Sequence, residues 1–296
     1  MSMVSRWSGF VLLVAAIAVA TVYQIGVINT TEPAIYQVDR TVKYSLTIKN
    51  PSNKPVKQAS FWLYAPIQQG VYQVLDGIES THPYQLEGDE SGNQRMIFSV
   101  EDLPPYGRKR YTVTARLRLS EQPNSLPMIK QQDYLAEESL IEISNPAIQK
   151  LAQRLSANSD RLVVKNIFNW VVSNIEKSGY VAREQGAVET LKSKSGDCTN
   201  SMYLFAALSR ANGIATRNMA GFTTTENALL KPQNYHNWLE VFVDGQWRLI
   251  DPDKEVFMDR AADYIAMTVL NDSPSEEPRL TRRLFGGSGN IEISMD

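Results

Sequence analysis

Cysteine, histidine and net charge are all scarce in this chain of 296 residues. Its single cysteine, Cys198, cannot form an internal disulfide, and with only two histidines it falls short of a Cys/His zinc cluster. The formal net charge is −2 and no block of basic residues stands out, so nucleic acid is not an expected partner. We therefore expect neither a bound metal nor a cofactor.

The overall composition is that of an ordinary folded protein. Hydrophobic residues make up 43% of the chain and charged residues 21%, so a sizeable core can form. The length allows about one to three domains, and the sequence shows no internal repeat.

The amino terminus contains the one long uncharged run. Residues 9–28 carry no charge and, as a helix, have about the length of a bilayer core. Arg6 precedes the run and Glu32 follows it, which favours a cytoplasmic amino terminus and an extracytoplasmic body. We predict a signal anchor or transmembrane helix over 1–31 and a periplasmic body. Two alternatives stay open: a signal peptide cleaved after Ala20, which would secrete the body, and a buried core helix.

The next segment has the period of β-strands. Apolar and polar residues alternate in two stretches, with apolar members Val42, Tyr44, Leu46 and Ile48, and later Tyr111, Val113, Ala115, Leu117 and Leu119. Turn sequences such as NPSNKP separate the strands. This pattern predicts an immunoglobulin-like β-sandwich over 32–125, with its aromatic residues in the core and His82 in a solvated loop. An envelope protein could be its partner.

Helical spacing replaces the alternation in the second half. After Asn145-Pro146, apolar residues recur three and four positions apart, namely Ile148, Leu151, Leu155, Leu162, Val164, Ile167, Phe168 and Val171. A further apolar helix is predicted over 199–211. Alternation then returns around Trp238, and Asp244-Gly245 predicts a tight hairpin turn. Residues 126–296 are therefore predicted to form an α+β domain.

Cys198 occupies the start of the helix predicted over 199–211. The free backbone N–H groups and the positive dipole end of a first helical turn favour a thiolate. Asp197 is expected to cap this helix, and Gly196 to supply backbone freedom for the turn before it. A lone thiol at a helix tip in an oxidising exterior suggests a nucleophile, although a buried small hydrophobic side chain is the alternative.

A nucleophilic thiolate needs a base, and His236 and Asp251 are placed to supply one. With Asp244-Gly245 as the turn, position 236 pairs near 253, so His236 and Asp251 fall on adjacent strands within side-chain reach. An aspartate there would fix the imidazole tautomer and stabilise the imidazolium. We predict a Cys198-His236-Asp251 triad, provided that the helix tip meets the edge of the sheet.

Blocks of sequence around these residues resemble the transglutaminase-like superfamily. They are GDC at 196–198, RANGIATR at 210–217, HNWLEV at 236–241 and DP at 251–252, within a resemblance that covers about 138–256. The resemblance implies a circularly rearranged papain-like core with Cys198 as nucleophile, His236 as base and Asp251 as orienter. Asn237 departs from the alanine that many members carry and leaves the triad intact.

The resemblance implies two activities, hydrolysis of peptide or isopeptide-type amides and transfer of a glutamine acyl group to an amine. Water is abundant outside the membrane, so we favour an amide hydrolase (peptidase or amidase) with a peptide or protein substrate. The alternatives are a cross-linking acyl transferase and a non-catalytic envelope assembly module. The Cys198 backbone N–H is the expected oxyanion donor, and Tyr180 and Trp170 are candidates for a second.

The remaining motif residues have structural interpretations. Trp238, Trp247 and Phe242 are expected in the core or a groove wall. The acidic run from Asp251 to Glu255 lacks the spacing and the glycine of an EF-hand, so no calcium site is expected.

Overall fold

A computed structural model describes residues 35–126, 131–179, 185–270 and 284–296. Residues 35–296 form one compact unit. The predicted anchor over 1–31 lies outside the described residues. Within the described ranges, none of the helices has both the length and the apolar character that a membrane crossing requires.

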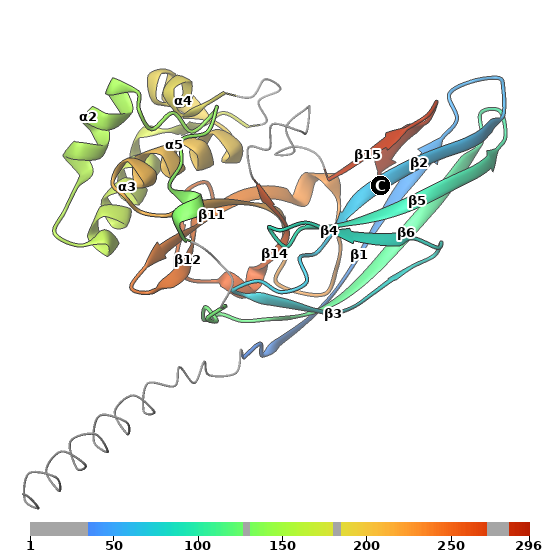
Figure 1. The fold of residues 1–296 in the computed structure, drawn as a ribbon, viewed down its shortest axis with the longest axis horizontal. Helices are drawn as coiled ribbons and strands as arrows, with labels where there is room; N and C mark the ends of the chain where they lie inside the picture. Colours follow the sequence, from blue (N-terminus) through green and yellow to red (C-terminus); the bar gives the residue numbers. More distant parts are fainter. Residues whose placement is uncertain (1–34, 127–130, 180–184, 271–283) are drawn as a thin grey trace, which may run out of the picture. The chain divides into compact units, whose positions relative to one another are not determined.

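Two sheets, antiparallel except for the short strand β10, form the first part of this unit (Figure 1). One sheet has the order β10-β1-β6-β3, with β16 also paired to β1. Its strands are β1 (Val38–Lys49), β3 (Gln73–Ser80), β6 (Arg108–Leu119), β10 (Ala228–Leu229) and β16 (Glu292–Met295). The other sheet has the order β15-β2-β5-β4, with strands β2 (Val56–Ala65), β4 (Gln85–Gly88), β5 (Gln94–Leu103) and β15 (Phe285–Ser288).

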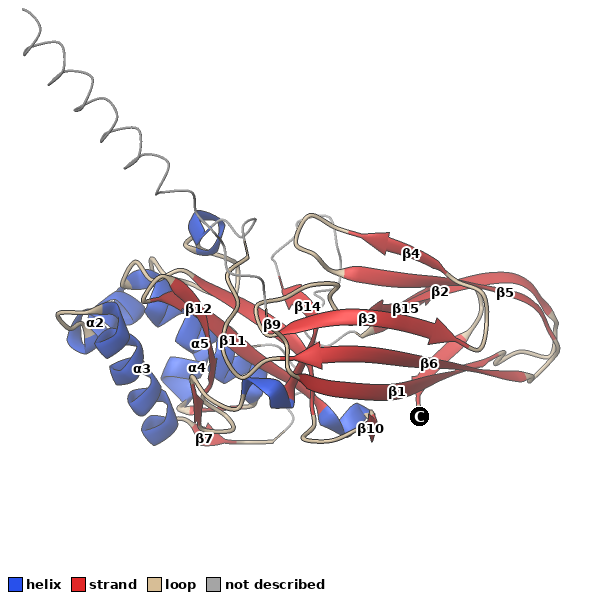
Figure 2. Cartoon of the chain, turned by 90° about the horizontal axis from the view of Figure 1, so that it is seen from below, coloured by secondary structure: helices blue, strands red, loops and turns tan. Residues whose placement is uncertain are grey.

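The period of two explains why these strands form and how they pack. The apolar residues of the alternating stretches are buried, including Val42 and Ile48, which are fully inaccessible. Phe61 stacks on Phe98 at 4.9 Å between ring centroids, and Tyr111 meets the Phe61 ring edge-on. Figure 2 shows the two strand layers that enclose this core. The two-layer arrangement confirms a strand-rich α+β chain, while the immunoglobulin-like assignment stays a prediction.

Short strands from the second half of the chain pair with the sandwich. β15 pairs with β2, β16 with β1, and β10 runs parallel to β1 with Val42 opposite Ala228. These pairings join strands on the two sides of the predicted domain boundary between 125 and 126. That boundary stays a prediction. Strands of two to four residues carry too little alternation to be recognised in the sequence.

The second part combines four described helices with a five-stranded sheet. The helices are α2 (Pro146–Leu155), α3 (Asp160–Asn174), α4 (Ala187–Ser193) and α5 (Cys198–Ala211). The sheet has the order β13-β12-β11-β9-β14, with β9 (Thr216–Thr223), β11 (Tyr235–Val243), β12 (Gln246–Asp251), β13 (Val256–Phe257) and β14 (Tyr264–Leu270). β7 (Glu176–Lys177) pairs with β8 (Ser195–Gly196), and 3₁₀ turns cover Gln131–Tyr134, Pro232–Asn234 and Ala261–Asp263.

Helix α5 lies at the centre of the α+β part. Residues from Thr199 to Arg210 are all buried, because α2, α3 and α4 contact the helix and β9 and β11 pack against it as well. A helix with apolar residues on nearly every face is stable in a folded protein when other helices and strands cover those faces. Contrary to the prediction, Leu162 does not belong to the buried face of α3 but is 49% exposed; the buried residues of this helix are Val163, Val164, Ile167, Phe168 and Val171.

The predicted hairpin is present between β11 and β12. Asp244 and Gly245 both have positive φ, 53° and 75°, as a two-residue turn that matches strand twist requires. Val243 pairs with Gln246 and Leu239 with Ile250, which is the register predicted from the sequence. This register brings the first residues of β11 towards the end of β12.

Candidate active site

Cys198 is the first residue of α5, directly after a capping box. The Asp197 carboxylate accepts a hydrogen bond from the backbone N–H of Asn200 at 3.1 Å, and the Asn200 side chain accepts one from the backbone N–H of Asp197 at 3.0 Å. The predicted cap is therefore confirmed. These reciprocal bonds fix the turn that presents the thiol.

Gly196 has a different role from the one predicted. Its φ is not positive, so the turn does not need backbone freedom there. Instead, a Cβ atom at this position would lie 2.6 Å from the Cβ of Asn200. Glycine is required because the incoming chain passes directly against the capping residue.

His236 and Asp251 meet as predicted. His236 Nε2 lies 2.6 Å from Asp251 Oδ2, although 15 positions separate them in the chain. Asp251 is completely buried and His236 is 6% exposed. The β11–β12 hairpin brings these two side chains together by its register alone.

Two further groups donate hydrogen bonds to the Asp251 carboxylate. The Tyr264 hydroxyl from β14 donates to Oδ2 at 2.8 Å, and the Lys254 backbone N–H donates to Oδ1 at 3.0 Å. Both carboxylate oxygens therefore have partners, as a buried charge requires. The sequence analysis did not single out Tyr264, which lies in an apolar strand without a recognisable motif.

The charges of this pair are set by their surroundings. Burial by itself would lower the pKa of His236, but hydrogen bonds to Asp251 and Cys198, and the charge of Asp251, raise it to about 9. Burial alone would raise the pKa of Asp251, but the hydrogen bond and positive charge of His236 outweigh it and lower that pKa overall. These shifts favour the imidazolium form of His236 and the carboxylate form of Asp251 at neutral pH.

The thiol of Cys198 lies beside both His236 and Asn237. Cys198 is close enough to His236 to help raise the pKa of the imidazole, and because Nε2 is bonded to Asp251, Nδ1 is the ring nitrogen left for the sulfur. Asn237 Oδ1 lies 4.0 Å from Cys198 Sγ and accepts a hydrogen bond from the Thr199 hydroxyl at 3.2 Å. The helix tip therefore does meet the sheet.

Of the two candidates for a second oxyanion donor, the structure describes one. Trp170 lies on α3, where the Lys194 ammonium stands 4.1 Å from the centroid of its ring. This cation–π contact accounts for its position as packing. Tyr180 lies outside the described residues.

Other residues of the sequence motifs have structural contacts. Arg217 and Glu240 form a buried ion pair, and the Arg217 guanidinium stands 4.7 Å from the centroid of the Trp247 ring. Trp238 is buried and meets the Tyr264 ring edge-on. In the described ranges, no three His, Cys, Asp or Glu side chains gather as metal ligands would.

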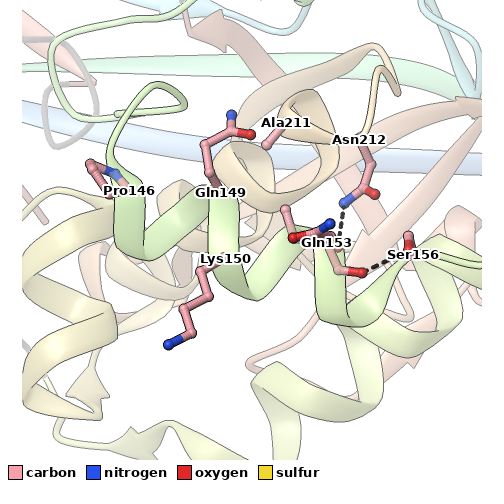
Figure 3. A pocket seen from close by; sticks show the side chains of 8 residues that line it. Pro146, Gln149, Lys150, Gln153, Ser156, Ala211 and Asn212 are labelled. Carbon is pink, nitrogen blue, oxygen red and sulfur yellow. Dashed lines mark hydrogen bonds between the residues drawn. The ribbon is translucent and has the colours of Figure 1, made fainter.

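Two surface hollows lined by described residues lie away from this site. One of about 680 Å³ is lined by α2 and by the carboxyl end of α5, at Ala211 and Asn212 (Figure 3). The length of α5, about 1.5 Å per residue, separates it from Cys198. A second hollow lies beside His82, which is half-buried with its ring 4.1 Å from that of Tyr111. His82 does lie in a loop, between β3 and β4, and its ring also packs on one side against Tyr111.

Comparison with known proteins identifies the α+β part. Residues 149–252 match the model of the transglutaminase-like superfamily. The chain is 23% identical over 178 residues to the kyphoscoliosis peptidase of Mus musculus, covering 56% of this chain and 26% of that protein. The match thus spans about a quarter of the relative's length. Residues 149–252 therefore match the model of the same superfamily that the sequence motifs resemble.

One solved structure shares the fold, and a second gives a weaker match. A candidate cysteine protease from Cytophaga hutchinsonii has a TM-score of 0.58 at 16% identity, over 88% of this chain and 91% of that one. The periplasmic domain of TgpA from Pseudomonas aeruginosa has a TM-score of 0.42 at 18% identity, over 76% of this chain and 74% of that one. The first of these likenesses extends through the sandwich as well as the α+β part.

Proposed function

We propose that this protein is a thiol-dependent amide hydrolase that acts on peptides or proteins outside the membrane. Cys198 is the nucleophile, His236 the proton carrier and Asp251 the group that orients and charges the imidazole. The observation that carries the proposal is the 2.6 Å contact between His236 and Asp251 next to the thiol at a helix amino terminus.

In the first half-reaction, the Cys198 thiolate attacks the amide carbonyl carbon and forms a C–S bond. The Cys198 backbone N–H, free at the start of α5, is the first donor to the oxyanion. As the tetrahedral intermediate collapses, His236 gives its proton to the departing amine and the C–N bond breaks. An acyl thioester remains on Cys198.

In the second half-reaction, neutral His236 removes a proton from water, which attacks the thioester carbonyl. The C–S bond breaks, the acid is released and the thiolate–imidazolium pair is restored. Because the pKa of His236 is raised to about 9, the imidazolium is present at neutral pH and activity should fall as the pH rises through that value.

The place of action rests on the uncharged run over 9–28, which we propose as an anchor that leaves the body in the periplasm. An amine in place of water would turn the same thioester into a cross-linked product, the acyl transferase outcome. A non-catalytic assembly module is the outcome in which Cys198 is dispensable.

The test uses the full chain with an electrophilic glutamine analogue, followed by intact-mass analysis. Since Cys198 is the only cysteine, one mass increment reports its labelling. We expect labelling in the wild type, none in Cys198→Ala, and at least about a 100-fold slower reaction in His236→Ala. His82→Ala is the matched control and should label like the wild type. Equal labelling of His236→Ala and wild type would contradict the proposal.

A second arm separates the two reactions. Peptide substrates are incubated with and without a labelled primary amine. Release of amine or ammonia without the label supports hydrolysis, whereas incorporation of the label in preference to hydrolysis identifies an acyl transferase.

A further inference from the structure

Tyr264 carries a buried hydroxyl that the proposed steps leave unused. It donates to Asp251 Oδ2 at 2.8 Å, and this oxygen also accepts from His236 Nε2 at 2.6 Å. Tyr264 is 4% exposed. Burial, together with the neighbouring charge of Asp251, raises the pKa of Tyr264, so the phenol keeps its proton and acts as a donor.

The position of this hydroxyl is fixed by the ring that carries it. The Tyr264 ring meets the Trp238 ring edge-on at 5.1 Å between centroids, and its backbone pairs with Thr223 on β9. The side chain reaches Asp251 past the β9 and β11 strands from the far edge of the sheet. Such a contact requires β14 to stand at a definite distance from β12.

Two features hold β14 at that distance. On the inner side, a Cβ atom at Gly221 would collide with the carbonyl oxygen of Ile265, so β14 can approach only a glycine. On the outer side, Gln73 of the sandwich accepts from the Ala266 N–H at 2.7 Å and donates to the Ala266 carbonyl at 2.9 Å. The Gln73 side-chain amide thus forms the two hydrogen bonds that the backbone of a neighbouring strand would form with β14. The bonded residue, Ala266, is two positions from Tyr264.

We propose that Tyr264 is a positioning residue of the triad, and that Gln73 couples it to the sandwich. The hydroxyl withdraws charge from Asp251 Oδ2, so the carboxylate stays ionised and the proton that it shares with His236 stays on the imidazole. Because the Tyr264 hydroxyl reduces the negative charge on that carboxylate oxygen, the imidazolium of His236 also stays acidic enough to protonate the leaving amine. The proposal rests on the proposed function for its effect on turnover.

The chain offers a simple spectroscopic test because it has only two histidines. The full chain, labelled with ¹⁵N-histidine, is titrated by NMR, with His82 as internal reference. Tyr264→Phe keeps the ring and removes the hydroxyl, so His236 becomes the only side-chain donor to Oδ2. We expect its titration midpoint to rise by about 0.5 to 1 pH unit. We also expect kcat to fall about 3- to 10-fold with KM unchanged.

The matched control is Tyr36→Phe, which removes a buried hydroxyl that donates to the Gly70 carbonyl at 2.8 Å within the sandwich. Tyr36→Phe should lower thermal stability without changing the titration midpoint of either histidine. A second variant, Gln73→Ala, leaves Tyr264 intact and should move the His236 midpoint in the same direction by weakening its placement. An unchanged or lowered His236 midpoint in Tyr264→Phe overturns the inference.

The two proposals fail separately. If the wild type cleaves no amide but Tyr264→Phe still raises the His236 midpoint, the proposed function is wrong and the role of Tyr264 in setting the pair stands. If the wild type cleaves amides and Tyr264→Phe matches it in midpoint and kcat, the role of Tyr264 is wrong and the function stands.

Discussion

The sandwich and the α+β part bury polar side chains of different kinds. In the sandwich, the amides of Asn50, Gln73, Asn93 and Gln94 are buried and bond to backbone groups. The α+β part contains three ion pairs with at least one buried member: His236 with Asp251, Arg217 with Glu240, and Arg210 with the half-buried Glu138. Arg40 is the charged exception in the sandwich, and it reaches the Ala262 carbonyl at 3.4 Å.

The kind of buried polar group therefore distinguishes the structural role of the sandwich from the chemical role proposed for the α+β part. A neutral amide satisfies backbone donors and acceptors at any pH, whereas a buried charge is costly without a partner and changes with pH when it has one. The sandwich can therefore hold strand edges in place without titrating. The α+β part holds the groups whose charge a reaction can use.

The largest effect is expected from Asp251→Asn. The amide leaves His236 without its anionic partner, so activity should fall about 10²- to 10⁴-fold. The His236 midpoint should drop from about 9 towards or below its ordinary value. Kinetics and the histidine titration check both parts, and full activity in this variant would break the link between buried charge and chemistry.

The same pair should make stability depend on pH. The raised pKa of His236, about 9 against 6.5, contributes on the order of 3 kcal/mol, fully present below pH 6.5. It is lost as the pH rises through about 9. Denaturant unfolding of wild type and Asp251→Asn across this pH window should show that the difference in their free energies of unfolding becomes smaller as the pH rises. A difference that does not change with pH would count against this contribution.

A comparable effect, on stability alone, is expected at the pair of Arg217 and Glu240. Glu240→Ala leaves Arg217 charged and without its carboxylate, which should cost about 3–5 kcal/mol. The double replacement Arg217→Met with Glu240→Leu should recover most of that loss. Urea unfolding measures both variants, and a single variant as stable as the double would mean that the unpaired charge carries no penalty.

The smallest effect is expected in the sandwich. Asn93 accepts from the Val269 N–H at 2.6 Å and donates to its carbonyl at 3.0 Å. Asn93→Ala should cost about 1–3 kcal/mol, equally at pH 6 and pH 9, with the His236 midpoint unchanged. A pH-dependent loss in this variant would erase the distinction between the two regions.

Local signals made much of the site predictable. The capping position of Asp197, the helix start at Cys198 and the hairpin turn at Asp244-Gly245 each depend on a few neighbouring residues. The fixed register of a two-residue turn then carried His236 to Asp251. The sequence motifs also resembled the superfamily whose model matches residues 149–252.

Long-range contacts were not predictable in the same way. Tyr264 sits in an apolar strand whose sequence gives no reason to expect a partner in Asp251. The need for glycine at position 196 comes from Asn200 and not from φ, and the exposed Leu162 breaks an otherwise correct helical stripe. Each depends on which surfaces meet after folding.

The sequence by itself determined the helix tip, the hairpin and therefore two of the three proposed catalytic residues as neighbours, because turn chemistry and strand register act over short stretches of chain. Only the tertiary structure decided that α5 would place Cys198 beside His236, and that β14, paired on its outer edge by Gln73, would bring Tyr264 to Asp251. Such contacts depend on the packing of distant apolar surfaces, and residue spacing along the chain does not specify which surfaces will meet.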